Sequence, residues 1–430
     1  MRRTFADIEA ESRELVRLFE NFAPRSVVAI RLGNRACWPA LLLALFRREL
    51  IPLPLGQHME GGELASALAT CGASALVEAE DDVLRIDRKL QIANGRVPDA
   101  DFLKLTSGTT SAARVVRFRA AQLLADCDQI CATMGFGPDD LNFGAIPFSH
   151  SYGFSNLLTP LLCRGVPLVA SDDWLPRAIL DGLAASGATV FPGIPVFFQK
   201  LAELENAPAL PHLRLCVSAG APLPPAVGEK FSARFGVKIH TFYGASECGG
   251  IAYDASGDAR YENGFVGTAM AGVDISPLHD GRVAVRSAAA GDGYFPVEDA
   301  ALSSGCFVPA DLVEWSKHGL KIVGRASDII NVAGRKLSPA SVEQRLLEFP
   351  GVRQAVVFGV PCALRGEEAI ACVAGEGIDA AGVLRHCHEC LSPWQVPRDV
   401  WIVPEIASND RGKISRRQLA AQYLAARPCP

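Results

Sequence analysis

Apolar and polar positions change their spacing in a regular order along the first 80 residues. Short runs of β-branched and leucine residues, typical of buried strands, are separated by stretches in which apolar residues recur every three or four positions, as on one face of a helix. The spacing predicts strands at Val27–Ile30, Leu50–Leu55 and Ala75–Val77, and helices at 5–22, Pro39–Arg47 and Glu63–Ala69. This alternation predicts a parallel sheet covered by helices.

The same alternation returns after a polar connection at 79–101 and continues to residue 241. The expected strands are Phe143–Pro147, Val166–Ala170, Thr189–Phe191, Leu213–Ser218 and Val237–Thr241. The expected helices are Ala120–Met134, Asn156–Leu162, Pro176–Ala185, Val196–Leu204 and Pro225–Phe235. This part of the chain is therefore predicted to be layered α/β structure.

The pattern changes after residue 260, where short alternating runs are joined by Asp-Gly and His-Gly turns at 280–281 and 318–319. Such turns are typical of antiparallel hairpins. A polar break, Gly324–Asp328, then precedes a stretch of roughly 100 residues, a common size for a domain, that again mixes strands and helices. The sequence predicts a large N-terminal domain and a small α+β C-terminal domain.

Composition limits the class of protein. Of the 430 residues, 49% are hydrophobic and 21% are charged, so the chain can form more than one buried core. The net charge of −5 and the absence of a long basic run argue against a nucleic-acid partner. The most apolar window, Pro39–Phe46, ends at two arginines and is too short for a membrane span. The 13 cysteines lack a disulfide-like spacing and the N-terminus looks like an amphipathic helix, so we expect a cytoplasmic protein.

One cysteine and histidine cluster, His386–Cys390 (HCHEC), has a spacing that suits a zinc site. No second Cys or His pair lies at a useful distance along the chain. The same segment places Val383, Leu384, Cys387 and Leu391 at helical spacing. We therefore favour an amphipathic helix over a metal site.

A stretch rich in hydroxyl groups supplies the first candidate for chemistry. Phe102–Arg117 (FLKLTSGTTSAARVVR) has an apolar start, a polar middle and a β-branched end, which predicts a strand–loop–strand hairpin. Such a loop can direct backbone N–H groups and hydroxyls at a polyphosphate, and the alternative is an ordinary polar turn. The stretch lacks the Gly-Lys-Ser/Thr ending of a Walker loop, and no dinucleotide-binding G-x-G-x-x-G follows a strand.

A carboxylate and an aromatic residue follow a strand that we expect to be parallel. Thr241–Glu247 (TFYGASE) lies at the carboxyl end of this strand, where α/β proteins bind ligands. Glu247 could hold Mg²⁺ against phosphate oxygens, and Tyr243 could stack on a purine. The alternative is a surface turn with a half-buried tyrosine.

Three charged residues in the last third of the chain complete the candidates. Asp311 and Arg325 flank one expected hairpin and suit ribose hydroxyls or a phosphate, with a surface ion pair as the alternative. Lys413 lies in the tight turn Asn409–Ile414, where most lysines are only solvated charges.

Together these stretches resemble the AMP-forming adenylating superfamily, which includes acyl-CoA synthetases, adenylation domains of peptide synthetases and luciferases. The matching motifs are Thr106–Arg114 to TSGTTGxPK, Tyr243–Glu247 to YGxTE, Asp311 to the aspartate of TGD, Gly324–Asp328 to GRxxD, and Lys413 to the GK of the C-terminal loop. The motifs occur in the family's order, and the likeness covers nearly the whole chain. The segment before the first loop is shorter than in most members.

The resemblance implies that the protein uses ATP and Mg²⁺ to convert a small-molecule carboxylic acid into an acyl-adenylate, with release of pyrophosphate. It implies that Lys413, Glu247 and His150 are catalytic and that Glu247 and Thr109 hold the metal. The implied nucleotide-binding residues are Thr106, Ser107, Gly108, Thr109, Thr110, Ser111, Arg114, Gly220, Ala221, Pro222, Tyr243, Gly244, Ser246, Asp311 and Arg325.

The resemblance also implies an α/β fold with three parts. Residues 1–324 would form layered α/β subdomains with a β-barrel-like portion, 325–328 a hinge, and 329–430 a mobile α+β lid domain. The chain departs from the usual motifs at Ser111 for Gly, Ala113 for Pro, Arg114 for Lys, and Ser327 for Asp or Lys. Arg keeps the charge of Lys but not its geometry.

The identity of the acid and of the thiol acceptor stays open. Amino-acid-activating relatives place an Asp near Phe148–Ser151 to hold the ammonium, and none stands there. His150 is expected to gate the pocket, with a capping or packed histidine as the alternative. The expected pocket residues are Phe154, Gly193, Ile194, Ser218, Phe242 and Ala245, which favour a fatty or aromatic acid.

Three functions follow from the resemblance. The first is an acid–CoA ligase, and the second is a standalone enzyme that loads the phosphopantetheine of an acyl carrier protein. The third is a degenerate nucleotide-binding homologue without turnover, which the altered loop would favour and the retained Glu247, Asp311 and Lys413 argue against.

Overall fold

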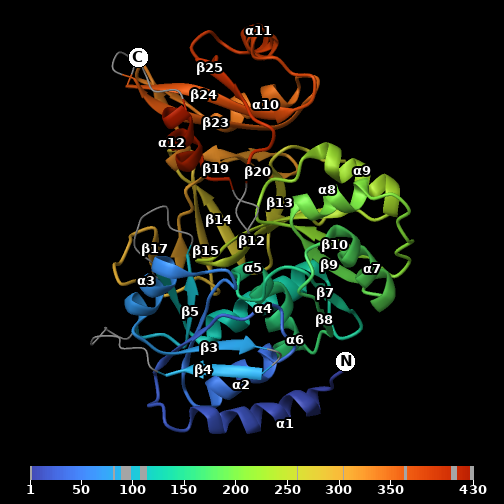
Figure 1. The fold of residues 1–430 in the computed structure, drawn as a ribbon, viewed down its shortest axis with the longest axis vertical. Coiled ribbons are helices and arrows are strands. Elements are labelled where there is room, and N and C mark those ends of the chain that lie inside the picture. The colour runs from blue at the N-terminus through green and yellow to red at the C-terminus, as the bar shows by residue number, and fades with distance from the viewer. Residues whose placement is uncertain are drawn as a thin grey trace. The chain divides into compact units, whose positions relative to one another are not determined.

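The computed structural model describes residues 2–80, 83–88, 98–106, 114–258, 260–303, 305–362, 366–407 and 414–426, and it has the predicted mixed α/β architecture (Figure 1). Contacts divide the chain into two compact units. Met1–Ser276 and Ala284–Pro309 form the first, and Pro277–Val283 and Ala310–Pro430 form the second. The hinge proposed at 325–328 falls inside the second of these units, and the predicted domain boundaries stay a prediction.

The N-terminal part of the first unit contains a four-stranded sheet. Its order is β2 (Ile51–Pro54), β1 (Val27–Ile30), β3 (Ala73–Glu80) and β4 (Val83–Asp87). β1 is parallel to β2 and β3, as predicted, and the helices of this part are α1 (Phe5–Val16), α2 (Trp38–Arg47) and α3 (Gly61–Cys71). The prediction of an irregular connection at 79–101 is wrong at β4, which runs antiparallel to β3. β4 has no buried position, so it carries no apolar periodicity that would reveal it.

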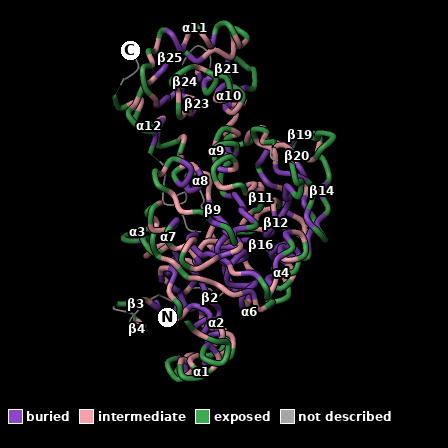
Figure 2. Tube along the Cα trace, turned by 90° about the vertical axis from the view of Figure 1, so that its right-hand side faces the viewer, coloured by how far each residue is buried: buried purple, intermediate pink, exposed green. Residues whose placement is uncertain are grey.

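The central sheet of the first unit follows the order β13 (Phe265–Ala269), β12 (Gly249–Tyr253), β11 (Ile239–Ala245), β10 (Leu215–Ser218), β9 (Val190–Gly193), β7 (Asn142–Gly144) and β8 (Leu168–Ala170). The five strands from β11 to β8 are parallel, and β12 and β13 continue the sheet in antiparallel pairing. Buried positions follow the strands of this sheet, such as β9, β11 and β12 (Figure 2). The parallel part confirms the strand–helix alternation read from the sequence.

Helices cover the two faces of the parallel strands. On one face are α7 (Pro176–Ser186), α8 (Pro195–Glu203) and α9 (Pro225–Phe235), drawn in green in Figure 1. The ring of Phe198 on α8 packs on the sheet, with its centre 5.4 Å from that of Phe191 on β9. On its other contact, the ring centre lies 5.2 Å from that of Phe231 on α9. On the other face are α4 (Ala120–Met134) and the helical run α5 (Ser151–Gly153), η2 (Phe154–Leu158) and α6 (Thr159–Arg164), where the Tyr152 hydroxyl donates to the Val217 carbonyl.

A three-stranded sheet of order β16 (Gly293–Phe295), β6 (Val115–Phe118) and β5 (Phe102–Leu105) holds the hydroxyl-rich stretch. β5 and β6 are antiparallel, with Leu105 opposite Val115, so the predicted hairpin is confirmed. β16 adds to the other edge of β6. A further sheet of order β14 (Val273–Pro277), β15 (Val283–Ser287), β18 (Cys306–Phe307) and β17 (Leu302–Ser303) belongs to the hairpin-rich region predicted after residue 260.

The second unit contains the predicted hairpin of β19 (Asp311–Ser316) and β20 (Gly319–Arg325), followed by a 3-10 turn, η3 (Ala326–Asp328). Beyond it, β22 (Arg335–Leu337), β21 (Ile330–Val332), β24 (Gly366–Gly375) and β23 (Val352–Cys362) form a sheet, and β25 (Asp399–Ile402) pairs with β24. Its helices are α10 (Pro339–Leu347), α11 (Ala380–Cys390) and α12 (Arg416–Ala426).

The helix interpretation of the cysteine and histidine cluster is confirmed, because His386–Cys390 belongs to α11. Cys387 is buried in the core, and the His386 ring bonds the Arg345 carbonyl oxygen at 2.8 Å. Among the residues that the structure describes, no group of three His, Cys, Asp or Glu side chains could hold a metal ion. None of the described helices combines the length and apolar character needed to cross a membrane.

Candidate functional site

The carboxyl ends of three parallel strands bring several predicted residues to one edge of the central sheet. Gly193 of β9, Ser218 of β10 and Thr241 of β11 stand side by side in register. The segments that leave these strands therefore start from the same edge, which is where α/β sheets bind ligands. They include the exposed turn formed by Gly220, Ala221 and Pro222, and the segment that ends at Glu247.

The segment after Thr241 continues β11 and turns tightly into β12. Tyr243 is buried, and the register with β12 shifts between Tyr243 and Gly244. At Gly244 an added Cβ would lie 2.8 Å from the Gly249 carbonyl oxygen, so this close approach needs glycine. The Ser246 hydroxyl accepts a hydrogen bond of 2.9 Å from the Ser151 hydroxyl. The structure thus fixes the predicted motif as a compact turn with defined partners.

Glu247 lies in this turn and is half-buried. The Tyr294 hydroxyl of β16 donates to Glu247 Oε1 at 3.0 Å, and the Gly291 N–H donates to the Glu247 carbonyl at 2.9 Å. Burial is the main cause that raises the pKa of the Tyr294 hydroxyl, and the neighbouring Glu247 carboxylate raises it further. The phenol therefore stays protonated near neutral pH and remains a donor to Glu247.

Arg114 connects the end of the hydroxyl-rich loop to the same carboxylate. Its guanidinium lies 3.7 Å from the centre of the Tyr294 ring, and its Nη1 lies 2.9 Å from Asp299 Oδ2. Tyr294 and Asp299 were not among the predicted site residues. They lie far from the hydroxyl-rich loop in sequence, and the pairing of β16 with β6 places Phe295 opposite Val115, next to Arg114.

The start of the loop is closed by Thr106. Its N–H and its hydroxyl both donate to the Arg114 carbonyl, each at 3.0 Å. The predicted residues Ser107, Gly108, Thr109, Thr110 and Ser111 lie outside the described residues, as does Lys413. What the structure supplies is therefore the base of the loop and the carboxylate beside it.

The donor set at Glu247 fits Mg²⁺. Magnesium in nucleotide sites takes one or two carboxylates and completes its octahedron with phosphate oxygens and water, so it needs no all-protein cage. Glu247 offers one hard oxygen donor group on a turn that hydrogen bonds from Tyr294, Gly291 and Gly250 hold in place. Such a carboxylate suits a metal that arrives with a nucleotide.

His150 caps the start of α5, and its Nδ1 accepts a hydrogen bond of 3.3 Å from the Tyr152 N–H. The capping geometry considered from the sequence is thus present, and a gating role stays a prediction. Of the expected pocket residues, Phe154 packs its ring 4.4 Å from that of Phe102 and Phe242 lies 5.8 Å from Tyr152. Both rings are buried in these contacts.

Asp311 and Arg325 pair directly in the second unit. They are opposite one another in the β19–β20 register, and Arg325 Nε lies 2.8 Å from Asp311 Oδ1. The ion pair considered from the sequence is present, and a ribose contact stays a prediction. The side chains differ in exposure, with Asp311 at 12% and Arg325 at 53%.

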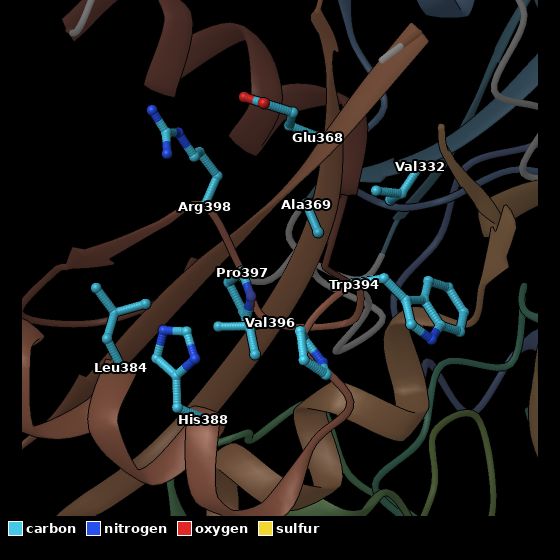
Figure 3. Close-up of a pocket in the computed structure, with 10 residues that line it drawn as sticks. Val332, Glu368, Ala369, Leu384, His388, Trp394, Val396, Pro397 and Arg398 are labelled. Carbon is cyan, nitrogen blue, oxygen red and sulfur yellow. The ribbon is translucent and has the colours of Figure 1, made fainter. Parts of the chain in front are cut away.

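Figure 3 shows a cavity of about 210 Å³ in the second unit, beside α11 and β24. Apolar Leu384 and Val396 line it together with Trp394, His388 and Arg398. None of the residues predicted to bind ATP, metal or acid is among its lining residues. The candidate site therefore rests on the strand ends and turns described above.

Two family models match the chain in the order that its motifs predict. The model of the AMP-binding enzyme matches residues 1–291, and that of the AMP-binding enzyme C-terminal domain matches residues 341–413. The chain belongs to the AMP-binding enzyme family. The resemblance inferred from the motifs is thereby confirmed.

Individual relatives of this AMP-binding enzyme are distant. Probable CoA ligase CCL9 of Humulus lupulus is 28% identical over 379 residues, covering 82% of this chain and 72% of the relative. Feruloyl-CoA synthase of Amycolatopsis sp is 25% identical over 467 residues, covering 98% and 94%. Some curated relatives are much longer, and the chain spans 18% and 13% of two of them.

The solved structure of ATP-bound MatB from Rhodopseudomonas palustris superposes with a TM-score of 0.86 at 22% identity, covering 97% of this chain and 93% of MatB. This similarity confirms the predicted fold class.

Proposed function

We propose that this AMP-binding enzyme activates a carboxylic acid with ATP to an acyl-adenylate, releases pyrophosphate, and transfers the acyl group to the thiol of CoA. The observation that carries the proposal is the match of family models to both the N-terminal and the C-terminal part of the chain. The motif positions of Glu247, Asp311 and Lys413 keep the residue types that this chemistry needs. The relatives named as CoA ligase and feruloyl-CoA synthase agree with it.

The first step must bring two anions together, the substrate carboxylate and the α-phosphate of ATP. Neutralising and aligning them is the main task of the protein in such a step. We assign the bridging positive charge to Lys413. We assign the β- and γ-phosphates to the hydroxyl-rich loop, residues 106–111, whose base is closed by the contacts of Thr106 with Arg114.

Glu247 and Thr109 would hold Mg²⁺, and the chemistry that the metal would supply there is neutralisation of charge on the phosphates. The hydrogen bond from Tyr294 keeps one Glu247 oxygen oriented, and Arg114 fixes the Tyr294 ring from its other side. This chain of contacts also gives Arg114 a defined position although it replaces the usual lysine.

The nucleoside would lie at the edge formed by the carboxyl ends of β10 and β11. Gly220, Ala221 and Pro222 on one strand end and Tyr243 on the other would enclose adenine, with Gly244 and Ser246 beside the phosphates. Asp311 would accept hydrogen bonds from the ribose hydroxyls, and Arg325 would orient it, as their direct contact permits.

In the second step the thiol sulfur attacks the acyl carbon of the adenylate, AMP leaves with the electron pair of the broken C–O bond, and the thiol proton is released to solvent. We propose that the C-terminal domain turns about residues 325–328 between the steps, removing Lys413 and admitting the thiol. Ser327, at the usual position of Asp or Lys, donates to the Asp328 side chain at 3.1 Å.

The acid is proposed to be an uncharged fatty or aromatic acid. No Asp stands near Phe148–Ser151 to hold an ammonium group. The relative named feruloyl-CoA synthase points toward the aromatic class. His150 would gate the pocket.

The function is tested by acid-dependent pyrophosphate release with ATP and Mg²⁺, over a panel of fatty, aryl and amino acids, with CoA added or withheld. We expect release with one acid class and acceleration by CoA. Release that is indifferent to CoA would identify an enzyme that loads a carrier protein instead. ATP binding without release for any acid would leave a homologue without turnover.

The role of Lys413 is tested by Lys413→Ala. Adenylate formation should fall by several orders of magnitude, because the charge that bridges the two anions is lost. Transfer from preformed acyl-adenylate to the thiol should remain largely intact. Separate assays of the two half-reactions decide this, and equal loss in both would contradict the rotating-domain account.

A further inference from the structure

A lysine is buried on the strand that leads into the hydroxyl-rich loop. Lys104 lies on β5, two residues before Thr106, and only 4% of its side chain is exposed. Its ammonium lies over the rings of Phe118 and Phe154, at 4.7 and 5.6 Å from their centres. A charge in such surroundings is costly unless other groups compensate it.

The groups that compensate the Lys104 charge come from the helices α4 and η2. Lys104 Nζ lies 3.9 Å from Asp126 Oδ2 on α4 and 3.4 Å from the Ser155 hydroxyl. The Ser155 hydroxyl in turn donates to Asp126 Oδ2 at 2.5 Å. The Asp126 side chain is also only 4% exposed, so the three groups form one buried polar cluster.

Asp126 holds the turn that carries Glu247. Its Oδ1 accepts a hydrogen bond of 3.1 Å from the Gly250 N–H, at the start of β12. Gly249 has φ of +71°, and a Cβ added there would overlap the Asp126 carboxylate. The backbone after Glu247 is therefore seated on a carboxylate whose charge Lys104 balances.

We propose that Lys104 is a positioning residue that fixes Glu247 relative to the hydroxyl-rich loop, by holding the Asp126 carboxylate in its seat on the Gly250 N–H. The cluster connects β5, which leads into the loop, to the turn that presents Glu247. Tyr294 holds the Glu247 carboxylate from β16, and Asp126 on α4, paired with Lys104, holds the backbone at Gly250, three residues further on.

Without the ammonium, Asp126 would be a buried charge with no counter-ion. The carboxylate would move toward solvent or draw in water, and either change weakens its hydrogen bond with the Gly250 N–H. Glu247 would then be less well placed for Mg²⁺. The inference rests on the proposed function for its catalytic consequence, but its effect on metal-dependent ATP binding can be measured without turnover.

The test compares ATP affinity by calorimetry in Mg²⁺ and in EDTA, for the wild type, Lys104→Met and Lys104→Met/Asp126→Asn. In Lys104→Met we expect the factor by which Mg²⁺ tightens ATP binding to fall at least fivefold. In the double variant the unpaired Asp126 charge is gone, and the new amide oxygen still accepts a hydrogen bond from the Gly250 N–H. The double variant should therefore recover about half of the fall in the Mg²⁺ factor, measured on a logarithmic scale. Pyrophosphate release should show a lower kcat, with the KM for the acid within twofold of wild type.

Lys238→Met is the matched control, because Lys238 and Asp254 also form a buried pair in the first unit, at 2.8 Å with 9% and 6% exposure. It should lower the melting temperature and leave the Mg²⁺ factor unchanged. If Lys104→Met loses stability but keeps the Mg²⁺ factor within twofold of wild type, the role is only structural and the inference is wrong. If Lys104→Met does not fold, the double variant decides the question. A double variant in which Mg²⁺ tightens ATP binding by the same factor as in the wild type overturns the inference equally.

The proposed function can fail separately. The wild type could bind ATP more tightly with Mg²⁺ and still release no pyrophosphate with any acid. That result would contradict the proposed function, while the calorimetric comparison of the variants would still test the role of Lys104.

Discussion

Two ion pairs of this AMP-binding enzyme, one in each compact unit, differ in how far their side chains are buried. Lys104 and Asp126 are 3.9 Å apart, with both side chains 4% exposed. Arg325 and Asp311 are closer, at 2.8 Å, but half of the Arg325 side chain is in solvent. By distance alone the second pair would be ranked as the stronger.

Burial reverses this ranking. An exposed pair gains little, because water and salt screen the attraction and two side chains lose freedom. A buried pair is not necessarily stabilising in total, but removal of one partner leaves a charge without compensation, which costs far more. The buried pair therefore supports the fold around Glu247. In the second pair Asp311 is largely buried, but the half-exposed Arg325 can be rearranged for a ligand at smaller cost, because water can replace its contacts.

The largest effect on stability is expected for Asp126→Asn. The substitution leaves Lys104 without its counter-ion, so the free energy of unfolding should fall by about 3 kcal/mol, in the range for a broken buried pair. Urea unfolding at pH 7 measures it. A loss below about 1 kcal/mol, typical of surface pairs, would remove the contrast between the two pairs.

The same variant should change how stability depends on pH. Burial lowers the pKa of Lys104, and the Asp126 carboxylate acts in the opposite direction, so its removal should lower that pKa further. Between the folded and the unfolded pKa the unfolded chain binds a proton that the folded chain does not. The free energy of unfolding should therefore rise with pH through this window and level off near pH 10.4, the ordinary pKa of lysine. In Asp126→Asn the rise should begin at lower pH than in the wild type.

An intermediate effect is expected for Arg416→Met in the second unit. The Arg416 guanidinium donates to Asp328 at 2.7 Å, to both oxygens of Glu343 at 2.7 and 3.0 Å, and to the Val357 carbonyl at 3.0 Å. Its side chain is 31% exposed, so solvent partly replaces these contacts. Loss of charged hydrogen bonds in this setting should lower the free energy of unfolding by about 2 kcal/mol.

Arg416→Lys is the control, because it keeps the charge but not the bidentate geometry. It should lie between the wild type and Arg416→Met in denaturant unfolding. If Arg416→Met is as harmful as Asp126→Asn, burial does not order these ion pairs and the comparison fails.

The sequence predicts the elements whose apolar spacing reflects a buried face, and it misses what depends on long-range pairing. Strands such as Val27–Ile30 and helices such as Pro176–Ser186 have apolar positions that tertiary contacts then bury. β4 was missed because Val83–Asp87 has no buried face, and Val83 is 63% exposed. The hydrophobic pattern identifies cores, not edges.

The candidate site divides in the same way. The motif residues Tyr243 and Glu247 follow a strand that the pattern locates, so the sequence could place them at its carboxyl end, and it could place Thr106 in a separate hairpin. The support behind them could not be placed, because Asp126 reaches Gly250, 124 positions away along the chain. One signal was available, since a lone lysine in the apolar run FLKL needs a buried counter-ion if the strand is internal.

The smallest effect on stability is expected for Asp311→Asn, and this variant should combine it with a large effect on the KM for ATP. The amide keeps an acceptor for Arg325, so the free energy of unfolding should change by less than about 1 kcal/mol. Under the proposed function the same change removes the charged acceptor of the ribose hydroxyls, so the KM for ATP should rise about tenfold or more, since charge-assisted hydrogen bonds are roughly twice as strong as neutral ones. Urea unfolding and pyrophosphate release at varied ATP separate the two quantities. A variant that loses stability as Asp126→Asn does would show that Asp311 supports the hairpin, whereas an unchanged KM would remove it from the nucleotide site. Either result would replace the view that the buried pair holds the scaffold while the half-exposed pair serves the ligand.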